Sequence, residues 1–289
     1  MAINQGQFVD LLTEHRRQNW NRIQTPAWQE RIVRGLAQHQ KPRALSRINA
    51  NIALPPGAMV LDLGSGIGNM VLACRKQGLR AFGVEPDRIG LNSSSSVSAT
   101  ALGIASQRLE QPPFAAATGE QLPFADATFD LVVMDQVIEH VANQEQVLAE
   151  SIRVLKPGGA LYVACPNYLR FHESHYKVWF LPLFPKFLGA FYLRLRGRDP
   201  ALLRQIIYTT NWRVRKLLAA AGIRRFVDLN CEEFLDKCRG QGANASSRKA
   251  KAVVAIAGIP GLSSLMLRAA SFYVRLREGG SEMVAYKDA

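Results

Sequence analysis

The stretch VLDLGSGIGN, residues 60–69, decides the fold of this 289-residue chain. A short apolar strand, expected at Met59–Leu63, runs directly into a loop with glycines at positions 64, 66 and 68. Glycine at these positions lets the backbone turn tightly and approach a ligand without interference from a Cβ atom. We therefore expect a ligand site at the carboxyl end of this strand.

Strand and helix patterns alternate on both sides of the loop. The expected strands are Met59–Leu63, Arg80–Val84, Phe114–Ala117, Phe129–Met134 and Ala160–Ala164. The expected helices between them are Asn69–Gln77, Asp87–Leu102 and Gln144–Leu155. This rhythm favours an α/β fold in which helices cover both faces of a parallel sheet.

The flanks of this core have different patterns. Gln5–Asn49 is predicted to be helical, and Pro55-Pro56-Gly57 marks its boundary with the core. The part after Pro166 is predicted to hold a helix, two strands, a polar linker and an apolar helix pair. In order these are the helix Trp212–Ala221, the strand Phe226–Leu229, the linker Gly240–Lys251, the helix pair, and Met283–Tyr286 as a closing edge strand. We divide the chain into an N-terminal arm (1–54), a core (55–166), a cap (167–211) and a C-terminal part of the core with a helical insertion (212–289).

Composition excludes several classes of protein. Hydrophobic residues make up 48% and charged residues 20% of the chain, which excludes a disordered or fibrous protein. The four cysteines form no CxxC pair, so we expect neither a disulfide framework nor a zinc site, and a reducing, cytoplasmic compartment fits best. The N-terminal residues lack a basic region followed by an apolar stretch, so we expect them not to be a secretory signal, and no apolar run is long enough to predict a spanning helix.

The positive charge is unevenly distributed. The chain carries 36 basic and 23 acidic residues, a net charge of +13, and residues 166–289 alone hold 21 basic and 9 acidic ones. The densest stretch, Lys186–Arg225, has ten basic residues and one acid. This asymmetry indicates either attraction to a nucleic acid, an anionic membrane surface or a phosphorylated substrate, or simply a solvated basic face.

Acidic residues near the loop narrow the choice of ligand. Glu85 ends the second expected strand, where an acid can accept hydrogen bonds from ribose hydroxyls. A dinucleotide site would have glycine where this chain has Asn69, and the anionic Asp62 repels a pyrophosphate. S-adenosylmethionine carries an adenosine and a cationic sulfonium but no phosphate, so it matches better than a nicotinamide dinucleotide, although an oxidoreductase stays an alternative.

Four sequence blocks carry a family resemblance. They are LDLGSGIG (61–68), GVEPD (83–87), TGEQLPFADATFDLVVMDQVIEHV (118–141) and VLKPGGALYVACPN (154–167). In order and spacing they resemble the class I S-adenosylmethionine-dependent methyltransferases of type 11. The resemblance implies a Rossmann-like, doubly wound, mostly parallel seven-stranded sheet, with S-adenosyl-L-methionine as cofactor.

The resemblance also implies which residues bind the cofactor. They are Asp62, Gly64, Ser65, Gly66, Gly68, Glu85, Pro86, Gly119, Glu120, Leu122, Asp135 and Gln136. Asp62 and its glycines would line the methionine part, Glu85 the ribose, and Asp135 with Gln136 the sulfonium. Thr118 stands where many relatives have an aspartate at the adenine, which leaves that contact to the backbone or to Glu120. The alternatives are that Asp62 caps a helix and that Glu85 is a turn residue.

Methyl transfer to a hydroxyl also requires a proton acceptor. The candidates are the histidines His140, His172 and His175, together with Glu139; His140 could equally be a packed, hydrogen-bonded histidine. In the segment His172-Glu173-Ser174-His175 the two histidines are three residues apart, not four as in HExxH, so we expect no metal site.

The cap combines apolar and basic residues. The stretch Val178–Leu188 is aromatic and aliphatic, and Arg194, Arg196 and Arg198 follow it. This composition suits either an interfacial element at an anionic membrane or a hydrophobic cover over the acceptor pocket. We expect methyl transfer to an oxygen of an apolar, lipid-linked or glycan intermediate. The alternatives are C-methylation of a quinone or another small-molecule ring, and a non-catalytic membrane-associated adaptor. Nucleic acid is a less favoured partner, because no reader motif is present.

Overall fold

The computed structural model describes residues 4–20, 26–37, 43–86, 105–106, 113–238, 272, 274, 276 and 280–288. The expected helix Asp87–Leu102 and the linker Gly240–Lys251 lie outside these residues, as does most of the expected helix pair after the linker.

Seven strands form one sheet in the order β3-β2-β1-β4-β5-β7-β6. The strands are β1 (Met59–Leu63), β2 (Arg80–Glu85), β3 (Phe114–Ala116), β4 (Phe129–Asp135), β5 (Leu155–Pro166), β6 (Arg225–Asp228) and β7 (Gly280–Tyr286). The first five strands run parallel, and β7 is antiparallel to both β5 and β6. The chain leaves β1 toward β2 and later returns to its other side as β4. This change of direction places the crevice of a doubly wound sheet at the carboxyl ends of β1 and β4.

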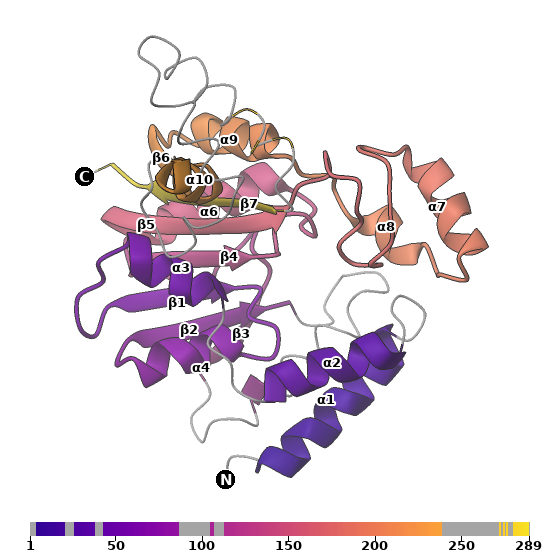
Figure 1. The fold of residues 1–289 in the computed structure, drawn as a ribbon. Helices are drawn as coiled ribbons and strands as arrows, with labels where there is room; N and C mark the ends of the chain where they lie inside the picture. The colour runs from indigo at the N-terminus through magenta and orange to yellow at the C-terminus, as the bar shows by residue number, and fades with distance from the viewer. Residues whose placement is uncertain are drawn as a thin grey trace.

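Helices cover both faces of the sheet, which confirms the expected α/β, Rossmann-like architecture (Figure 1). The described helices are α1 (Gln5–Trp20), α2 (Pro26–Ala37), α3 (Arg43–Asn51), α4 (Asn69–Lys76), α6 (Gln144–Val154), α7 (Lys186–Leu195), α8 (Ala201–Gln205), α9 (Asn211–Ala220) and α10 (Leu229–Cys238). Helices α6 and α9 pack on one face, and α3, α4 and α10 pack on the other. The segment expected to be helical from Gln5 to Asn49 thus contains the separate helices α1, α2 and α3.

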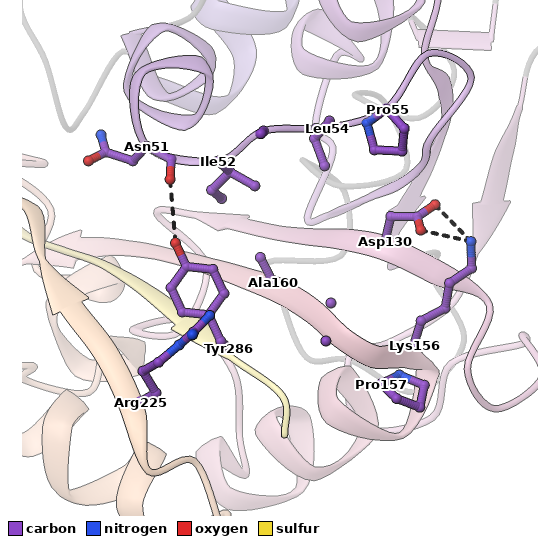
Figure 2. Close-up of a pocket in the computed structure, with 13 residues that line it drawn as sticks. Asn51, Ile52, Leu54, Pro55, Asp130, Lys156, Pro157, Ala160, Arg225 and Tyr286 are labelled. Atoms are coloured by element: carbon purple, nitrogen blue, oxygen red, sulfur yellow. Dashed lines mark hydrogen bonds and ion pairs between the residues drawn. The ribbon is translucent and has the colours of Figure 1, made fainter. Parts of the chain in front are cut away.

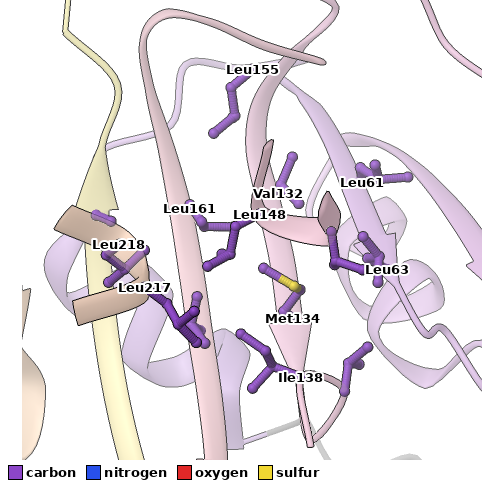
Figure 3. Close-up of a cluster of buried hydrophobic side chains, with 14 of the residues drawn as sticks. Leu61, Leu63, Val132, Met134, Ile138, Leu148, Leu155, Leu161, Leu217 and Leu218 are labelled. Carbon is purple, nitrogen blue, oxygen red and sulfur yellow. The ribbon is translucent and has the colours of Figure 1, made fainter. Parts of the chain in front are cut away.

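The core explains why the strands sit where they do. Leu61 and Leu63 of β1 belong to the cluster under α6 and α9 (Figure 3), whereas Val60 belongs to the cluster on the opposite face. Successive side chains of a strand point to opposite faces, so a strand whose residues are all apolar can be covered on both sides. Leu61 and Val60 are 0% exposed, as this position requires.

One strand expectation is wrong. Met283–Tyr286 belongs to β7, but β7 lies between β5 and β6, so β6 is the edge strand on this side. The pattern of apolar residues along a strand indicates which of its faces are buried. It does not reveal how many neighbours the strand has, because that number depends on pairing with segments distant in sequence.

The arm and the cap both flank the carboxyl ends of the parallel strands (Figure 1). Helices α1 and α2 pack through Phe8, Leu12 and Val33, and Ile67 of the glycine loop packs against this cluster. The cap has an apolar cluster of its own, which includes Tyr176. Among the described helices, none has the length and hydropathy needed to cross a membrane.

Candidate active site

The glycine loop is fixed by hydrogen bonds to the end of the neighbouring strand. The N–H groups of Gly64 and Ser65 both donate to the carbonyl oxygen of Val84, at 2.8 and 2.9 Å. The N–H of Gly66 donates to Oε2 of Glu85 at 2.9 Å. Glu85 therefore holds the loop that follows β1 against the end of β2, and Pro86 follows it, half-buried.

The glycines of the loop serve different purposes. A Cβ on Gly64 would lie 2.5 Å from Cγ2 of Val137, so a side chain there would separate the ends of β1 and β4. Gly68, which precedes α4, is similarly close to Phe114, at 2.7 Å. At Gly66, with φ of +49°, no atom of the residues that the structure describes lies within 4 Å of the Cβ position. The space beside Gly66 is open, and a ligand can approach the backbone there.

Three carboxylates gather at the ends of β1, β2 and β4. Burial raises the pKa of Asp62 well above its ordinary value, and the negative charges of Asp135 and Glu85 raise it further. Desolvation raises the pKa of Asp135, the last residue of β4, to about 6, and the negative charge of Glu282 contributes to this shift. Because burial and mutual repulsion oppose ionisation of Asp62 and Asp135, a ligand that brings positive charge would be favoured beside them.

These features fit S-adenosylmethionine. The open space at Gly66 admits a ligand next to the loop backbone, and the three acids attract a cation and repel a phosphate. The hydroxyl oxygen of Ser65 is buried and has no hydrogen-bond partner among the described residues, so it is a polar atom that a polar ligand could satisfy.

The residues expected beside the adenine, Gly119 and Glu120, contact the start of α6 and the core of the sheet. Oε1 of Glu120 accepts hydrogen bonds from the N–H groups of Ala142 and Asn143, at 3.2 and 3.3 Å, just before α6. Gly119 is buried against Leu63 and Val147. The Glu120 carboxylate therefore holds the start of α6 against the segment that follows β3.

Leu122 and Gln136 are two further residues predicted to bind the cofactor. The Leu122 side chain belongs to the hydrophobic core and is 4% exposed. Gln136 adopts a positive φ of 61°, and its N–H donates to the carbonyl oxygen of Ala164 at 2.8 Å. This rare conformation for a non-glycine residue ends β4 sharply, directly after Asp135.

The structure brings two of the three predicted histidines together. Nε2 of His140 lies 3.3 Å from Nε2 of His175, and the ring planes are nearly perpendicular. Nδ1 of His175 lies 2.9 Å from Oε1 of Glu173, which also accepts a hydrogen bond from the Tyr168 hydroxyl at 3.1 Å. His172 is exposed and lies outside this group. We call Glu139, His140, Glu173 and His175 the histidine cluster.

Burial shifts the ionisation of the histidine cluster. It raises the pKa of Glu139, whose side chain is 0% exposed, to about 8. Loss of solvation lowers the pKa of His140 to about 4, and the neighbouring His175 contributes to this shift. Burial opposes ionisation of Glu173 too, but hydrogen bonds from His175, Tyr176 and Tyr168 outweigh it and lower the pKa. His140 is therefore a neutral imidazole at pH 7.

Sequence reasoning missed the supporting residues of the histidine cluster. Glu173 and Tyr168 were not among the predicted site residues, although Glu173 stands between the two histidines of the segment that was considered. No local pattern identifies them, because their role depends on how the cap folds back onto the end of β4. The hydrogen bond from the N–H of Ile207 to the carbonyl oxygen of Glu139, at 2.8 Å, is part of that attachment.

A second pocket, of about 300 Å³, lies at the opposite edge of the sheet (Figure 2). Its polar side chains are engaged with one another: Lys156 pairs with Asp130 at 2.8 Å, and Arg225 lies over the ring of Tyr286. It adjoins the amino ends of β4 and β5, away from the glycine loop and the acids. We place the candidate active site at the carboxyl edge, where the open loop and the acids meet.

Comparison with known proteins finds a related domain in this part of the chain. Residues 61–163 match the family model described as methyltransferase domain. This stretch is similar to a methyltransferase domain. It contains β1, the glycine loop, Glu85, Asp135 and His140, so the features described above belong to the matched part of the chain.

Relatives of the methyltransferase domain include proteins of two bacterial genera. The chain is 35% identical over 112 residues to an uncharacterized methyltransferase of Mycobacterium leprae, which is 39% of this chain and 38% of that protein. It is 34% identical over 113 residues to a ubiquinone biosynthesis O-methyltransferase of Rhizobium rhizogenes, 38% of this chain and 42% of that protein. The chain thus spans about two fifths of the length of these curated relatives.

Solved structures share the fold at low identity. A phosphoethanolamine N-methyltransferase 2 of Haemonchus contortus, solved with S-adenosyl-L-methionine, has a TM-score of 0.52 at 14% identity, covering 86% of this chain and 52% of that one. The YcgJ protein of Bacillus subtilis has a TM-score of 0.50 at 16% identity, covering 85% and 98%. These likenesses support the fold around the methyltransferase domain.

Proposed function

We propose that this protein transfers a methyl group from S-adenosylmethionine to an oxygen of an apolar, lipid-linked acceptor. The observation that carries the methyl-transfer part is the carboxyl edge of β1, β2 and β4, where an open glycine loop meets Asp62, Glu85 and Asp135. The match of residues 61–163 to the methyltransferase domain supports it.

The chain's own residues would hold and orient the reactants. The backbone at Gly66 and the carboxylates of Asp62 and Glu85 would bind the cofactor, which supplies an electrophilic methyl group on a positively charged sulfur. The leaving group is already good, so alignment and exclusion of water are the protein's main contributions. The arm and the cap flank this edge and can exclude water from it (Figure 1).

Deprotonation of the acceptor is the second requirement. Loss of solvation lowers the pKa of His140 to about 4, which makes its imidazole a neutral but weak base, and its place beside His175 at the end of β4 would let it accept a proton from an acceptor hydroxyl. His175 lies beside it and is itself held by Glu173, which fixes the orientation of the pair. This arrangement favours an oxygen acceptor over a carbon acceptor, and the Rhizobium relative is named as an O-methyltransferase.

The apolar nature of the acceptor is argued from α7. Phe187, Phe191 and Leu195 follow one another at four-residue intervals and are 73%, 60% and 71% exposed. An exposed apolar stripe of this kind is typical of a helix that binds an apolar surface. Arg194, Arg196 and Arg198, at the end of α7 and just after it, could bind anionic lipid headgroups. We therefore propose that α7 rests on an anionic membrane from which the acceptor enters the site.

Calorimetry tests the cofactor part. We expect the full chain to bind S-adenosylhomocysteine, and Asp62→Asn and Glu85→Gln each to weaken binding about tenfold or more, since a hydrogen bond to a charged group contributes about 1.5–3 kcal/mol. Asp126→Asn, a change of an exposed acid elsewhere, should leave binding unchanged. Absence of heat with well-folded protein would remove the proposal.

Vesicle sedimentation tests the membrane part. The wild-type chain should pellet with vesicles that contain an anionic lipid, and the doubly substituted Phe187→Ser/Phe191→Ser variant should stay in the supernatant. Phe272→Ser is the matched control, because Phe272 is 55% exposed but does not belong to α7. If the wild type does not pellet even at low salt, and methylates only water-soluble acceptors, the membrane proposal fails while methyl transfer stands.

A further inference from the structure

The histidine cluster has the geometry of a metal site. One carboxylate oxygen of Glu139 and one ring nitrogen each of His140 and His175 all lie within 4.8 Å of one another. Glu139 and His140 follow β4, whereas His175 comes from the cap. Two segments distant in sequence thus direct three donor atoms of the kinds that bind transition metals toward one point.

The separation of the two ring nitrogens suits a shared ion. The Nε2 atoms of His140 and His175 are 3.3 Å apart. Two zinc–nitrogen bonds of about 2.0–2.1 Å at a tetrahedral angle place their nitrogens about 3.3 Å apart. Oε1 of Glu139 lies 3.8 Å from Nε2 of His140, close enough for a small side-chain rotation to complete the set.

The surroundings of His175 prepare it as a ligand. Its Nδ1 contacts Oε1 of Glu173 at 2.9 Å, so the Nδ1–H donates to the carboxylate and Nε2 keeps its lone pair. Glu173 is in turn fixed by the hydroxyl of Tyr168 and by the N–H of Tyr176, at 3.1 and 2.6 Å. A carboxylate that orients a histidine in this way is a frequent outer partner of metal-binding histidines.

An independent observation comes from Glu139. Its side chain is fully buried, and neither of its carboxylate oxygens has a hydrogen-bond partner among the residues that the structure describes. A buried carboxyl without partners is unfavourable, and Asp135 and Glu173 add negative charge nearby. A cation between Glu139 and the histidines would satisfy the carboxylate and offset this charge.

We propose that Glu139, His140 and His175 bind a divalent transition-metal ion, with Zn²⁺ as the best match for two imidazoles and one carboxylate. Three protein ligands leave at least one coordination position for water or for a ligand oxygen, as in catalytic zinc sites. The sequence predicts no metal because only the spacing between His172 and His175 is visible there. In the folded chain His175 is paired with His140 instead.

The metal proposal deepens the proposed function but does not depend on it for binding. If methyl transfer takes place at this edge of the sheet, an ion here would polarise an acceptor oxygen, in place of proton acceptance by His140. Metal binding can be measured without any acceptor and without the cofactor.

The test uses the full chain after removal of metal with a chelator. We expect titration with ZnCl₂ in a calorimeter to show one site per chain, and titration with CoCl₂ to develop visible absorption from a bound ion. Glu139→Gln and His175→Ala should weaken binding at least tenfold, and Glu173→Gln about 10–100-fold. The matched control is His172→Ala, which removes a nearby histidine outside the histidine cluster and should bind as the wild type does.

Two results would overturn the proposal. One is the absence of saturable binding of both ions to the wild type. The other is wild-type affinity in both Glu139→Gln and His175→Ala, which would place the ion elsewhere. Circular dichroism melts identify a variant that does not fold, and the Glu173→Gln variant, which keeps all three ligands, then supplies the comparison. S-adenosylhomocysteine calorimetry on the same samples separates loss of metal from loss of the cofactor site.

Discussion

Gly64 combines two constraints that no other residue type meets together. Its φ is +73°, in the left-handed region, and a Cβ would press against Val137 at 2.5 Å. Gly57 has the same φ, but the position of its Cβ is open. Comparing these two glycines separates backbone strain from steric crowding, because Gly64 has both and Gly57 has the strain alone.

We predict that Gly64→Ala destabilises the protein more than Gly57→Ala does. Both variants carry the strain of a left-handed alanine, of order 1 kcal/mol, and Gly64→Ala adds overpacking of about 1–3 kcal/mol. Chemical denaturation of both variants measures the free energies of unfolding. Equal losses would show that Val137 moves aside at no cost.

At the scale of elements, the cap is organised around Tyr176. Its hydroxyl donates to the carbonyl oxygen of Asp199 at 2.8 Å and accepts from the N–H of Leu203 at 3.2 Å. These bonds join the segment that carries His175 to the start of α8. They therefore help to hold the histidine cluster as well as the cap.

We predict that Tyr176→Phe loosens the cap without unfolding the sheet. The substitution leaves two backbone groups without their partner, at a cost of about 1–3 kcal/mol. Limited proteolysis should cut residues 167–211 faster than in the wild type. Tyr192→Phe is the control, because Tyr192 packs in the same cap cluster and its hydroxyl makes neither of these bonds; equal rates for the two variants would contradict the prediction.

Elements with a strong local signal could be predicted from sequence. The glycine loop, the apolar strands around it and the acids near the carboxyl ends of β1, β2 and β4 are all visible as short patterns, and the observed strands agree with them to within a few residues for β1–β4. Pairing between distant segments could not be predicted. The position of β7 inside the sheet and the contact of His140 with His175 both arise from tertiary packing, which leaves no periodic trace in the sequence.

At the scale of the whole molecule, the sheet joins distant parts of the chain through Arg47. This residue of α3 hydrogen-bonds Glu282 of β7 at 2.7 Å and Asn230 of α10 at 2.8 Å, and it also pairs with Glu233. The side chains of Arg47 and Glu282 are only 16% and 14% exposed. The last helix before the core is thereby tied to the last strand.

We predict a positive coupling energy between Arg47 and Glu282. Arg47→Met removes one of the two arginines that pair with the mostly buried Glu282 carboxylate, and Arg43 at 3.1 Å stays, so the loss should lie at or below the lower end of the range of about 3–5 kcal/mol for breaking a buried pair from one side. The double variant Arg47→Met/Glu282→Gln should lose less than the sum of the two single variants. A double-mutant cycle by urea denaturation measures this, and strict additivity would contradict it.

Ile67 connects the N-terminal helices α1 and α2 with the glycine loop. Its aliphatic side chain belongs to the glycine loop and packs against the apolar cluster formed by α1 and α2. If the packing of α1 and α2 strengthens ligand binding at the glycine loop, thermodynamic linkage requires that ligand binding stabilise the packing of α1 and α2 by the same free energy. Slower amide hydrogen exchange in α1 would therefore report ligand binding at the glycine loop.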